Sequence, residues 1–303
     1  MDIIKHKWIF LGFSGVLVLA SAIAIVLFGL RPAIDFTGGT LWQIRIPNTE
    51  DRIQESQIIE TLVEQGIENP SVLRETSSDS FLIKTKPLSE AEHQQILSAL
   101  EERVGSVEEL RFESIGPTIG SQLRSKAIWA GILVLLAISV YIAISFRKVS
   151  YPVQSWKYGL TTLITLFHDV VIPTGILAVL GEFGGVEIDT NFIVALLVIM
   201  GFSVHDTIVV FDRVREQVLA RHKNESFTDT VNASVRQTIA RSVNTSFTLV
   251  LMLVAMLVFG SSTLQLFVGI LLVGTVIGTY SSICVASPLL TVWGKLSKMA
   301  SHT

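Results

Sequence analysis

The sequence contains little charge and almost no cysteine. Of its 303 residues, 50% are hydrophobic, only 16% are charged, and a single one, Cys284, is a cysteine. One cysteine cannot form a disulfide within the chain, and its apolar neighbours favour a small buried residue over a redox or metal role. So little charge in so apolar a chain excludes an ordinary soluble domain and indicates a membrane protein.

The motifs of several soluble enzyme classes are also missing. The sequence has no phosphate-binding loop, no paired CxxC, no HExxH and no Gly-x-Ser-x-Gly. Gly38-Gly39 is not followed by the Lys-Ser/Thr pair that a nucleotide-binding loop needs. We therefore expect no ATPase or hydrolase activity, no metal or other cofactor, and no nucleic-acid partner.

Six stretches are apolar for long enough to cross a lipid bilayer. A spanning helix needs about 20 apolar residues, because lipid offers no hydrogen bonds to an unpaired backbone. The first stretch carries no charge and ends without a small-residue cleavage site, which predicts a retained anchor rather than a signal peptide. The predicted spans are residues 8–30, 128–146, 158–180, 192–211, 243–259 and 264–288.

The basic residues of the short loops predict the orientation of these spans. With the N-terminus inside, the cytoplasmic segments contain Lys and Arg, whereas residues 181–190 contain three acidic residues and no basic one. Arg124 and Lys126 oppose this rule, but they border a long translocated segment, where the rule is weak. Both termini are therefore expected in the cytoplasm, with residues 31–122 outside.

Residues 31–122 have the pattern of a small α/β domain. Strand patterns at 34–46, 71–75, 81–84 and 107–115 enclose helical patterns at 49–65, with Thr49 as N-cap, and at 88–103. The order βαββαβ is that of the ferredoxin-like arrangement. The predicted protein is a polytopic α-helical membrane protein with three parts: 1–30, an extracytoplasmic ferredoxin-like domain at 31–122, and 123–303.

Ionisable residues within the predicted spans are the candidate functional residues, because each is costly in hydrocarbon unless it is paired or hydrated. His168 and Asp169 fall near the middle of the third span. His205 and Asp206 fall in the cytoplasmic half of the fourth, and Arg241 precedes the fifth.

Asp206 and Arg241 are predicted at similar depth, where they can neutralise each other. Protonation of Asp206 would free Arg241 and turn proton arrival into a change of helix packing. A static salt bridge explains the same two residues as well. For His168 and Asp169, a structural hydrogen bond to a neighbouring helix is favoured over a secondary intramembrane polar site.

Glycines of the last span have a separate, structural interpretation. Gly269, Gly274 and Gly278 form a stripe of small residues that includes a Gly-x-x-x-Gly spacing. Such a spacing permits close contact between helices.

Four segments together carry a family resemblance. They are DFTGGT at 35–40, GPTIG at 116–120, FHD at 167–169 and GFSVHDTIVVFDR at 201–213. In this order, and over essentially the whole chain, they resemble the SecF members of the SecD/SecF family of bacterial protein-translocase subunits, in the resistance-nodulation-division superfamily. The resemblance implies a SecD partner, the SecYEG channel, the SecA motor and preprotein substrates. It also implies the bacterial inner membrane and proton-driven pulling on its outer side.

The resemblance also implies roles for single residues. In that family, an Asp and an Arg at the positions of Asp206 and Arg241 are implicated in proton coupling, together with a carboxylate from the SecD half. Two other functions stay open from the sequence. One is a scaffold that stabilises the translocon without using energy, and the other is half of a small-molecule efflux transporter, for which the outer domain is small.

His205 departs from the family pattern, in which Asn is common before the Asp. A neutral His can hydrogen-bond as Asn does, but it can also titrate near neutral pH. We therefore predict that the export rate of His205→Asn depends less on pH than that of wild type, measured as precursor export across a pH series. Equal pH profiles would contradict this prediction.

Overall fold

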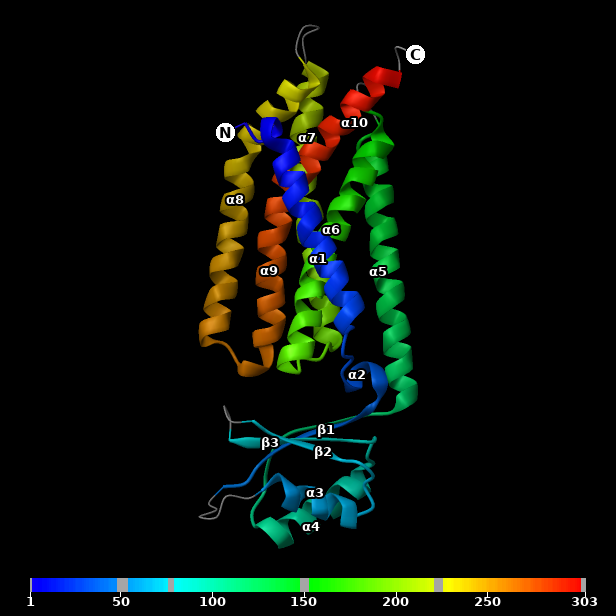
Figure 1. The fold of residues 1–303 in the computed structure, drawn as a ribbon, viewed down its shortest axis with the longest axis vertical. Helices are drawn as coiled ribbons and strands as arrows, with labels where there is room; N and C mark the ends of the chain where they lie inside the picture. Colours follow the sequence, from blue (N-terminus) through cyan, green and yellow to red (C-terminus); the bar gives the residue numbers. More distant parts are fainter. Residues whose placement is uncertain (1, 48–53, 76–78, 148–152, 221–225, 301–303) are drawn as a thin grey trace. The chain divides into compact units, whose positions relative to one another are not determined.

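A computed structural model describes residues 2–47, 54–75, 79–147, 153–220 and 226–300 of the chain (Figure 1). The chain divides into two compact units. The first combines Met1–Arg31 with Trp129–Thr303, and the second is Pro32–Ile128.

Long apolar helices make up the first unit, although residues 117–128, the start of one of them, belong to the second. Within the described ranges, six helices are long and apolar enough to cross a membrane, as predicted. Most continue past the predicted apolar stretch, because helical hydrogen bonding does not depend on apolar side chains. They are α1 (Lys7–Phe28), α5 (Pro117–Ser145), α6 (Ser155–Gly184), α7 (Thr190–Ala220), α8 (Phe227–Phe259), and a last one made of α9 (Gln265–Ser281), a π-helical turn (Ser282–Ala286) and α10 (Ser287–Ala300).

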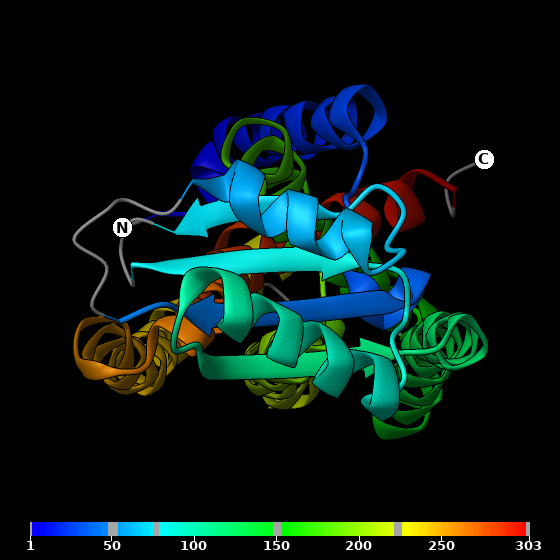
Figure 2. The ribbon, with the colours of Figure 1, turned by 90° about the horizontal axis from the view of Figure 1, so that it is seen from below.

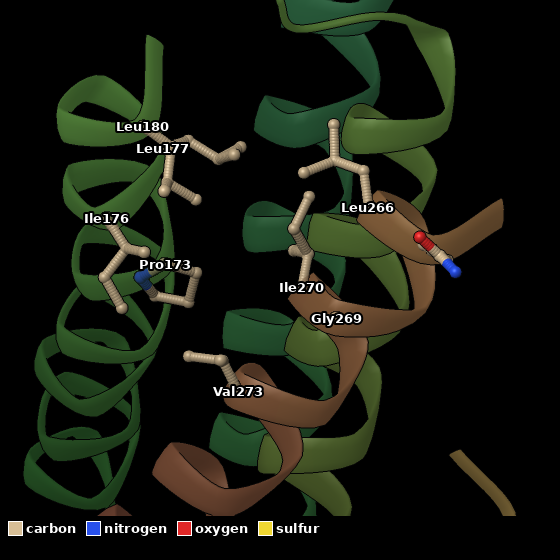
Figure 3. A pocket seen from close by; sticks show the side chains of 9 residues that line it. Pro173, Ile176, Leu177, Leu180, Leu266, Gly269, Ile270 and Val273 are labelled. Carbon is tan, nitrogen blue, oxygen red and sulfur yellow. The ribbon is translucent and has the colours of Figure 1, made fainter. Parts of the chain in front are cut away.

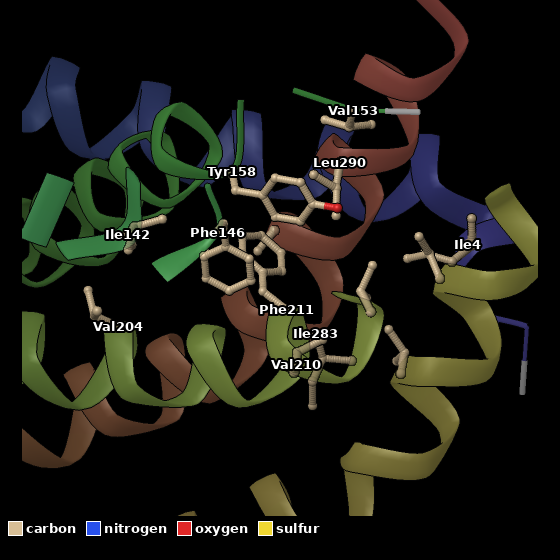
Figure 4. Close-up of a cluster of buried hydrophobic side chains, with 14 of the residues drawn as sticks. Ile4, Ile142, Phe146, Val153, Tyr158, Val204, Val210, Phe211, Ile283 and Leu290 are labelled. Atoms are coloured by element: carbon tan, nitrogen blue, oxygen red, sulfur yellow. The ribbon is translucent and has the colours of Figure 1, made fainter. Parts of the chain in front are cut away.

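Three aromatic rings pack together within the largest apolar core described for this unit (Figure 4). The rings of Phe146 and Tyr158 stack with centroids 5.1 Å apart. Phe211 of α7 meets the Tyr158 ring edge-on at 5.4 Å, and all three side chains are buried. Offset and edge-to-face contacts of this kind add to the free energy gained from burial. The cluster therefore fixes α6 against α7.

Small residues allow the helices to approach one another closely. A Cβ at Gly175 of α6 would lie 2.4 Å from the Cβ of Ser21 on α1. On α9, a Cβ at Gly274 would lie 2.2 Å from Ile199, and one at Gly278 would lie 3.1 Å from Ser203. The close contact predicted for the last span is confirmed at Gly274 and Gly278, which pack on α7. Gly269 has no neighbour within 4 Å of such a Cβ.

A four-stranded antiparallel sheet forms the second unit. Its strands lie in the order β2-β3-β1-β4, and Figure 2 shows both helices on one face of the sheet. Trp42, Ile44 and Ile83 from the sheet pack against Leu62 and Leu100 from the helices, all with 0% exposure. The elements are β1 (Gly39–Arg45), α3 (Glu55–Glu64), β2 (Ser71–Glu75), β3 (Ser80–Thr85), α4 (Glu90–Val104) and β4 (Glu108–Ile115).

The first strand and helix of this unit begin later than predicted. A short helix, α2 (Ile34–Thr37), replaces the start of the predicted strand. Gly38 and Gly39 follow with φ angles of 76° and 140°, so they turn the chain from α2 into β1. Other backbone approaches both closely, since a Cβ at Gly38 would lie 2.9 Å from the Cα of Pro117 and one at Gly39 would lie 3.1 Å from the carbonyl oxygen of Thr85. Helix α3 has Gln54 as its N-cap, in a capping box with Gln57. Thr49, the predicted N-cap, lies outside the described residues.

Two glycines of α6 provide a matched test of the contact between α1 and α6. Gly175→Ala is expected to destabilise the protein by about 1–3 kcal/mol, because the new methyl group overlaps Ser21. Gly159→Ala is the control, since its Cβ would meet nothing within 4 Å. The measurement is thermal unfolding in detergent. Equal melting temperatures for the two variants would contradict the close packing at Gly175.

Candidate functional site

Two carboxylates are buried within the apolar helices. Asp169 lies near the middle of α6 with 0% exposure, and Asp206 lies in the second half of α7 with 4% exposure. A buried carboxylate is costly unless hydrogen bonds or a nearby cation compensate for the water it has lost. The surroundings of each group therefore determine what it can do.

Asp169 is surrounded by hydrogen-bond partners from three helices. Its Oδ1 atom lies 2.8 Å from Nδ1 of the adjacent His168. Its Oδ2 atom accepts hydrogen bonds from Ser203 of α7 and from Ser281 of α9, the latter at 2.7 Å. The hydrogen bond predicted from this pair to a neighbouring helix is thus present twice, and Asp169 joins α6, α7 and α9.

Asp206 has a different environment. Its Oδ2 atom is buried without a hydrogen-bond partner among the described residues. Ser242 of α8 and the adjacent His205 are near enough to interact with the carboxyl group. Asp206 is therefore buried with less compensation than Asp169.

The predicted ion pair between Asp206 and Arg241 is absent from the described part of the chain. Asp206 points into the bundle, whereas the Arg241 side chain is exposed. Successive helix residues are rotated by about 100°, so α8 buries Ser242 and thereby turns Arg241 outward. Similar depth in two helices does not ensure that two side chains face each other, so the pairing of these two residues stays a prediction for another arrangement of the helices.

Arg241 belongs to an exposed polar face. Asn244 and Thr248 follow it on α8 at spacings of three and seven residues, so the three lie on one side of the helix. His205 of α7 is exposed as well. Polar side chains facing lipid are costly, and this pattern is typical of a helix that contacts another protein.

Hydroxyl groups join α7 to the π-helical turn, and the sequence predictions did not identify them. Thr207, next to Asp206, lies 2.9 Å from the hydroxyl of Ser282, the residue after Ser281. The Ser282 hydroxyl also contacts the backbone carbonyls of Gly278 and Ser203. Ser and Thr are common in spanning helices, where they bond their own backbone, so no pattern in the sequence distinguishes these two hydroxyls.

An apolar pocket of about 210 Å³ between α6 and α9 is separate from these polar groups (Figure 3). Pro173 and Leu177 line it from α6, and Gly269 and Ile270 line it from α9. None of the predicted site residues lines this pocket. Within the described ranges, no group of three or more His, Cys, Asp or Glu could hold a metal ion.

The chain is similar to known export proteins over nearly its whole length. The family "Protein export membrane protein SecD/SecF, C-terminal" matches residues 95–296. The protein translocase subunit SecF of Thermobaculum terrenum is 42% identical over 301 residues, covering 97% of this chain and 94% of the relative. The Synechocystis SecF is 35% identical, covering 96% and 92%. The SecDF of Thermus thermophilus is 35% identical. The match covers 92% of this chain but only 37% of the longer SecDF chain.

Solved structures of SecDF have the same fold. A crystal structure of SecDF from Thermus thermophilus, described as a translocon-associated membrane protein, superimposes with a TM-score of 0.80 at 30% identity. It covers 97% of this chain, and the chain spans 39% of that longer protein. A SecDF in a super-membrane-facing form gives a TM-score of 0.69 at 30% identity. The family match, the relatives and these structures agree, and the chain belongs to the SecD/SecF family of protein-export membrane proteins, among its SecF members.

Proposed function

We propose that this multi-pass membrane protein is the SecF subunit of the Sec preprotein translocase. Together with SecD it uses the proton-motive force to complete export after the SecA-driven step. The relatives named translocase subunit SecF support the assignment. One charge moved through 100 mV supplies about 2.3 kcal/mol, and several such transfers could drive a movement of the outer domain.

The observation that carries this proposal is the buried, incompletely compensated Asp206. A carboxyl group in that environment favours its neutral form, and a nearby cation would favour its charged form. Arg241 is the candidate cation, because it lies on the neighbouring helix α8 and faces outward. A change of packing that brings Arg241 to Asp206 would release a proton, and the reverse change would take one up.

SecD supplies the other half of the transporter in this proposal. The SecDF relatives are single chains of which this chain matches about two fifths. The exposed polar face with His205 and Arg241 is then covered by helices of SecD, which also provide a further carboxylate. Two halves of this kind usually form an ion site at their interface. SecYEG, SecA and the preprotein complete the assembly.

The proposed setting is the bacterial inner membrane, with both termini in the cytoplasm. The distribution of Lys and Arg in the short loops supports this orientation. The outer domain is then extracytoplasmic. Its βαββαβ element order and its β2-β3-β1-β4 strand order support a ferredoxin-like class for it.

Two alternatives make different predictions. A scaffold that uses no energy would tolerate neutral residues at Asp206 and Arg241 as long as the complex assembles. A half of a small-molecule efflux transporter is weaker, because the relatives over nearly the whole chain are named protein translocase subunits.

Neutral substitutions distinguish the pump from the scaffold. In cells depleted of the native subunit, Asp206→Asn and Arg241→Met are each expected to abolish stimulation of export, because the first cannot release a proton and the second cannot stabilise the charged carboxylate. The measurement is pulse-chase export of a secreted precursor, with membrane levels and SecD association checked for each variant.

Asp212→Asn is the control for this experiment. Asp212 lies on the same helix, but it is exposed and pairs only weakly with Arg215 at 3.4 Å. Export with this variant should match wild type. Wild-type export by Asp206→Asn and Arg241→Met would favour the scaffold and remove the proton-coupling role of both residues.

Thiol labelling tests the proposed orientation. After Cys284→Ser removes the single cysteine, a cysteine is introduced by Glu101→Cys on the exposed side of α4 or by Ala220→Cys at the end of α7. In intact spheroplasts, a membrane-impermeant maleimide should label the first variant, and label the second only after lysis. The opposite pattern would reverse the topology.

A further inference from the structure

We propose that the His168–Asp169 pair is a second proton-binding site, connected to Asp206 through the serine and threonine side chains between α7 and α9. This inference rests on the proposed proton-coupled function and extends it to residues in the centre of the helix bundle. Asp169 and His168 belong to the same helix, and both side chains are at least 96% buried.

The surroundings of the pair limit its net charge. Asp169 accepts hydrogen bonds from two serines and contacts His168, and no Lys or Arg pairs with it among the described residues. If His168 is neutral and Asp169 is ionised, the pair carries a net negative charge in a medium of low dielectric constant, offset by hydrogen bonds but by no cation among the described residues. One bound proton removes this charge, either on the carboxyl group or on the imidazole. The pair therefore holds one proton, and release of that proton is coupled to a change in its surroundings.

His168 has one nitrogen available for proton exchange. Its Nδ1 atom contacts Asp169, whereas its Nε2 atom is buried without a hydrogen-bond partner in the described structure. A histidine that served only to orient Asp169 would usually have a partner for its second nitrogen as well. The unpartnered Nε2 is where a proton would arrive or leave.

The neighbouring helices present few other titratable groups to this pair. Tyr280 of α9 packs its ring over His168 with centroids 6.3 Å apart. Asp206 of α7 lies one helical turn beyond Ser203. Cys284 lies in the π-helical turn, and Lys7, on α1, bonds Thr291 of α10. None of these groups hydrogen-bonds the carboxyl group of Asp169 in the described structure, so His168 is its direct titratable partner.

Hydrogen bonds made by Ser203 and Ser282 link the pair to Thr207, the residue that follows Asp206. Ser203 donates its hydroxyl to Asp169, and its backbone carbonyl accepts from Ser282. The Ser282 hydroxyl contacts Thr207, whose neighbour in the sequence is Asp206. Loss of the proton at Asp169 would strengthen the bonds from Ser203 and Ser281, since hydrogen bonds to an ionised acceptor are the stronger ones. This shift would reach α7 beside Asp206.

The test compares Asp169→Asn, Asp206→Asn and wild type in the complex with SecD. Infrared difference spectra of the complex in nanodiscs across a pH series report protonated carboxyl groups directly. Asp169→Asn should lose a pH-dependent band that Asp206→Asn retains, and export driven by the proton-motive force in inverted vesicles should show an altered pH profile. Asn keeps the size and hydrogen-bonding capacity of the side chain but does not titrate.

Ser281→Ala controls for a purely structural role. It removes one hydrogen bond to Asp169 and leaves both titratable groups, so the band should shift rather than disappear.

An unchanged infrared spectrum and a wild-type pH profile for Asp169→Asn would overturn the second site. If Asp206→Asn fails to export while Asp169→Asn matches wild type in both measurements, the proposed function stands and this inference falls. If Asp206→Asn exports normally while Asp169→Asn loses its band, the second site stands and the proposed role of Asp206 falls.

Discussion

Hydrocarbon cannot hydrogen-bond a polar group, and this constraint determines how the polar side chains of the long apolar helices are placed. Each buried polar side chain must find its partner on its own helix or on a neighbouring one. At Asp169 the partners come from three helices, so a single carboxyl group specifies how α6, α7 and α9 meet. Close packing supports the same contact, because Gly278 allows α9 to approach the backbone of Ser203.

Two consecutive serines, the last residue of α9 and the first of the π-helical turn, contact two different helices. Ser281 contacts Asp169 on α6, while Ser282 contacts Thr207 on α7. An extra residue in the turn frees a backbone carbonyl, and the hydroxyl of Ser287 bonds the carbonyl of Ser282, five residues earlier. π-helical turns within α-helices occur frequently at functional sites. Here the turn lies next to both buried carboxylates, so a change in its hydrogen bonding would alter the surroundings of Asp169 and of Asp206.

The sequence predicted the helices and the burial of two carboxyl groups, but not the partners of those groups. Local patterns determine the first, and contacts between distant segments determine the second. Spanning helices follow from apolar length alone, and βαββαβ follows from local periodicity. The buried positions of Asp169 and Asp206 also follow from their place within apolar runs. The pairing of Asp206 with Arg241 depends on the rotation of α8 about its axis, which apolar composition hardly constrains. The hydroxyls of Ser203 and Ser281 come from distant segments, and no local pattern marks them.

The contrast between the two carboxylates bears on how the protein could work. Asp169 has its partners within the chain, so its environment is complete without another subunit. Asp206 is buried, whereas Arg241 on α8 faces outward and is rotated by about 100° from the buried Ser242 that follows it. A chain that buries a carboxyl group and exposes a cation on the next helix has two available arrangements, paired and unpaired. In the proposed complex with SecD, the polar face around Arg241 is the surface at which the second subunit would determine which arrangement is stable.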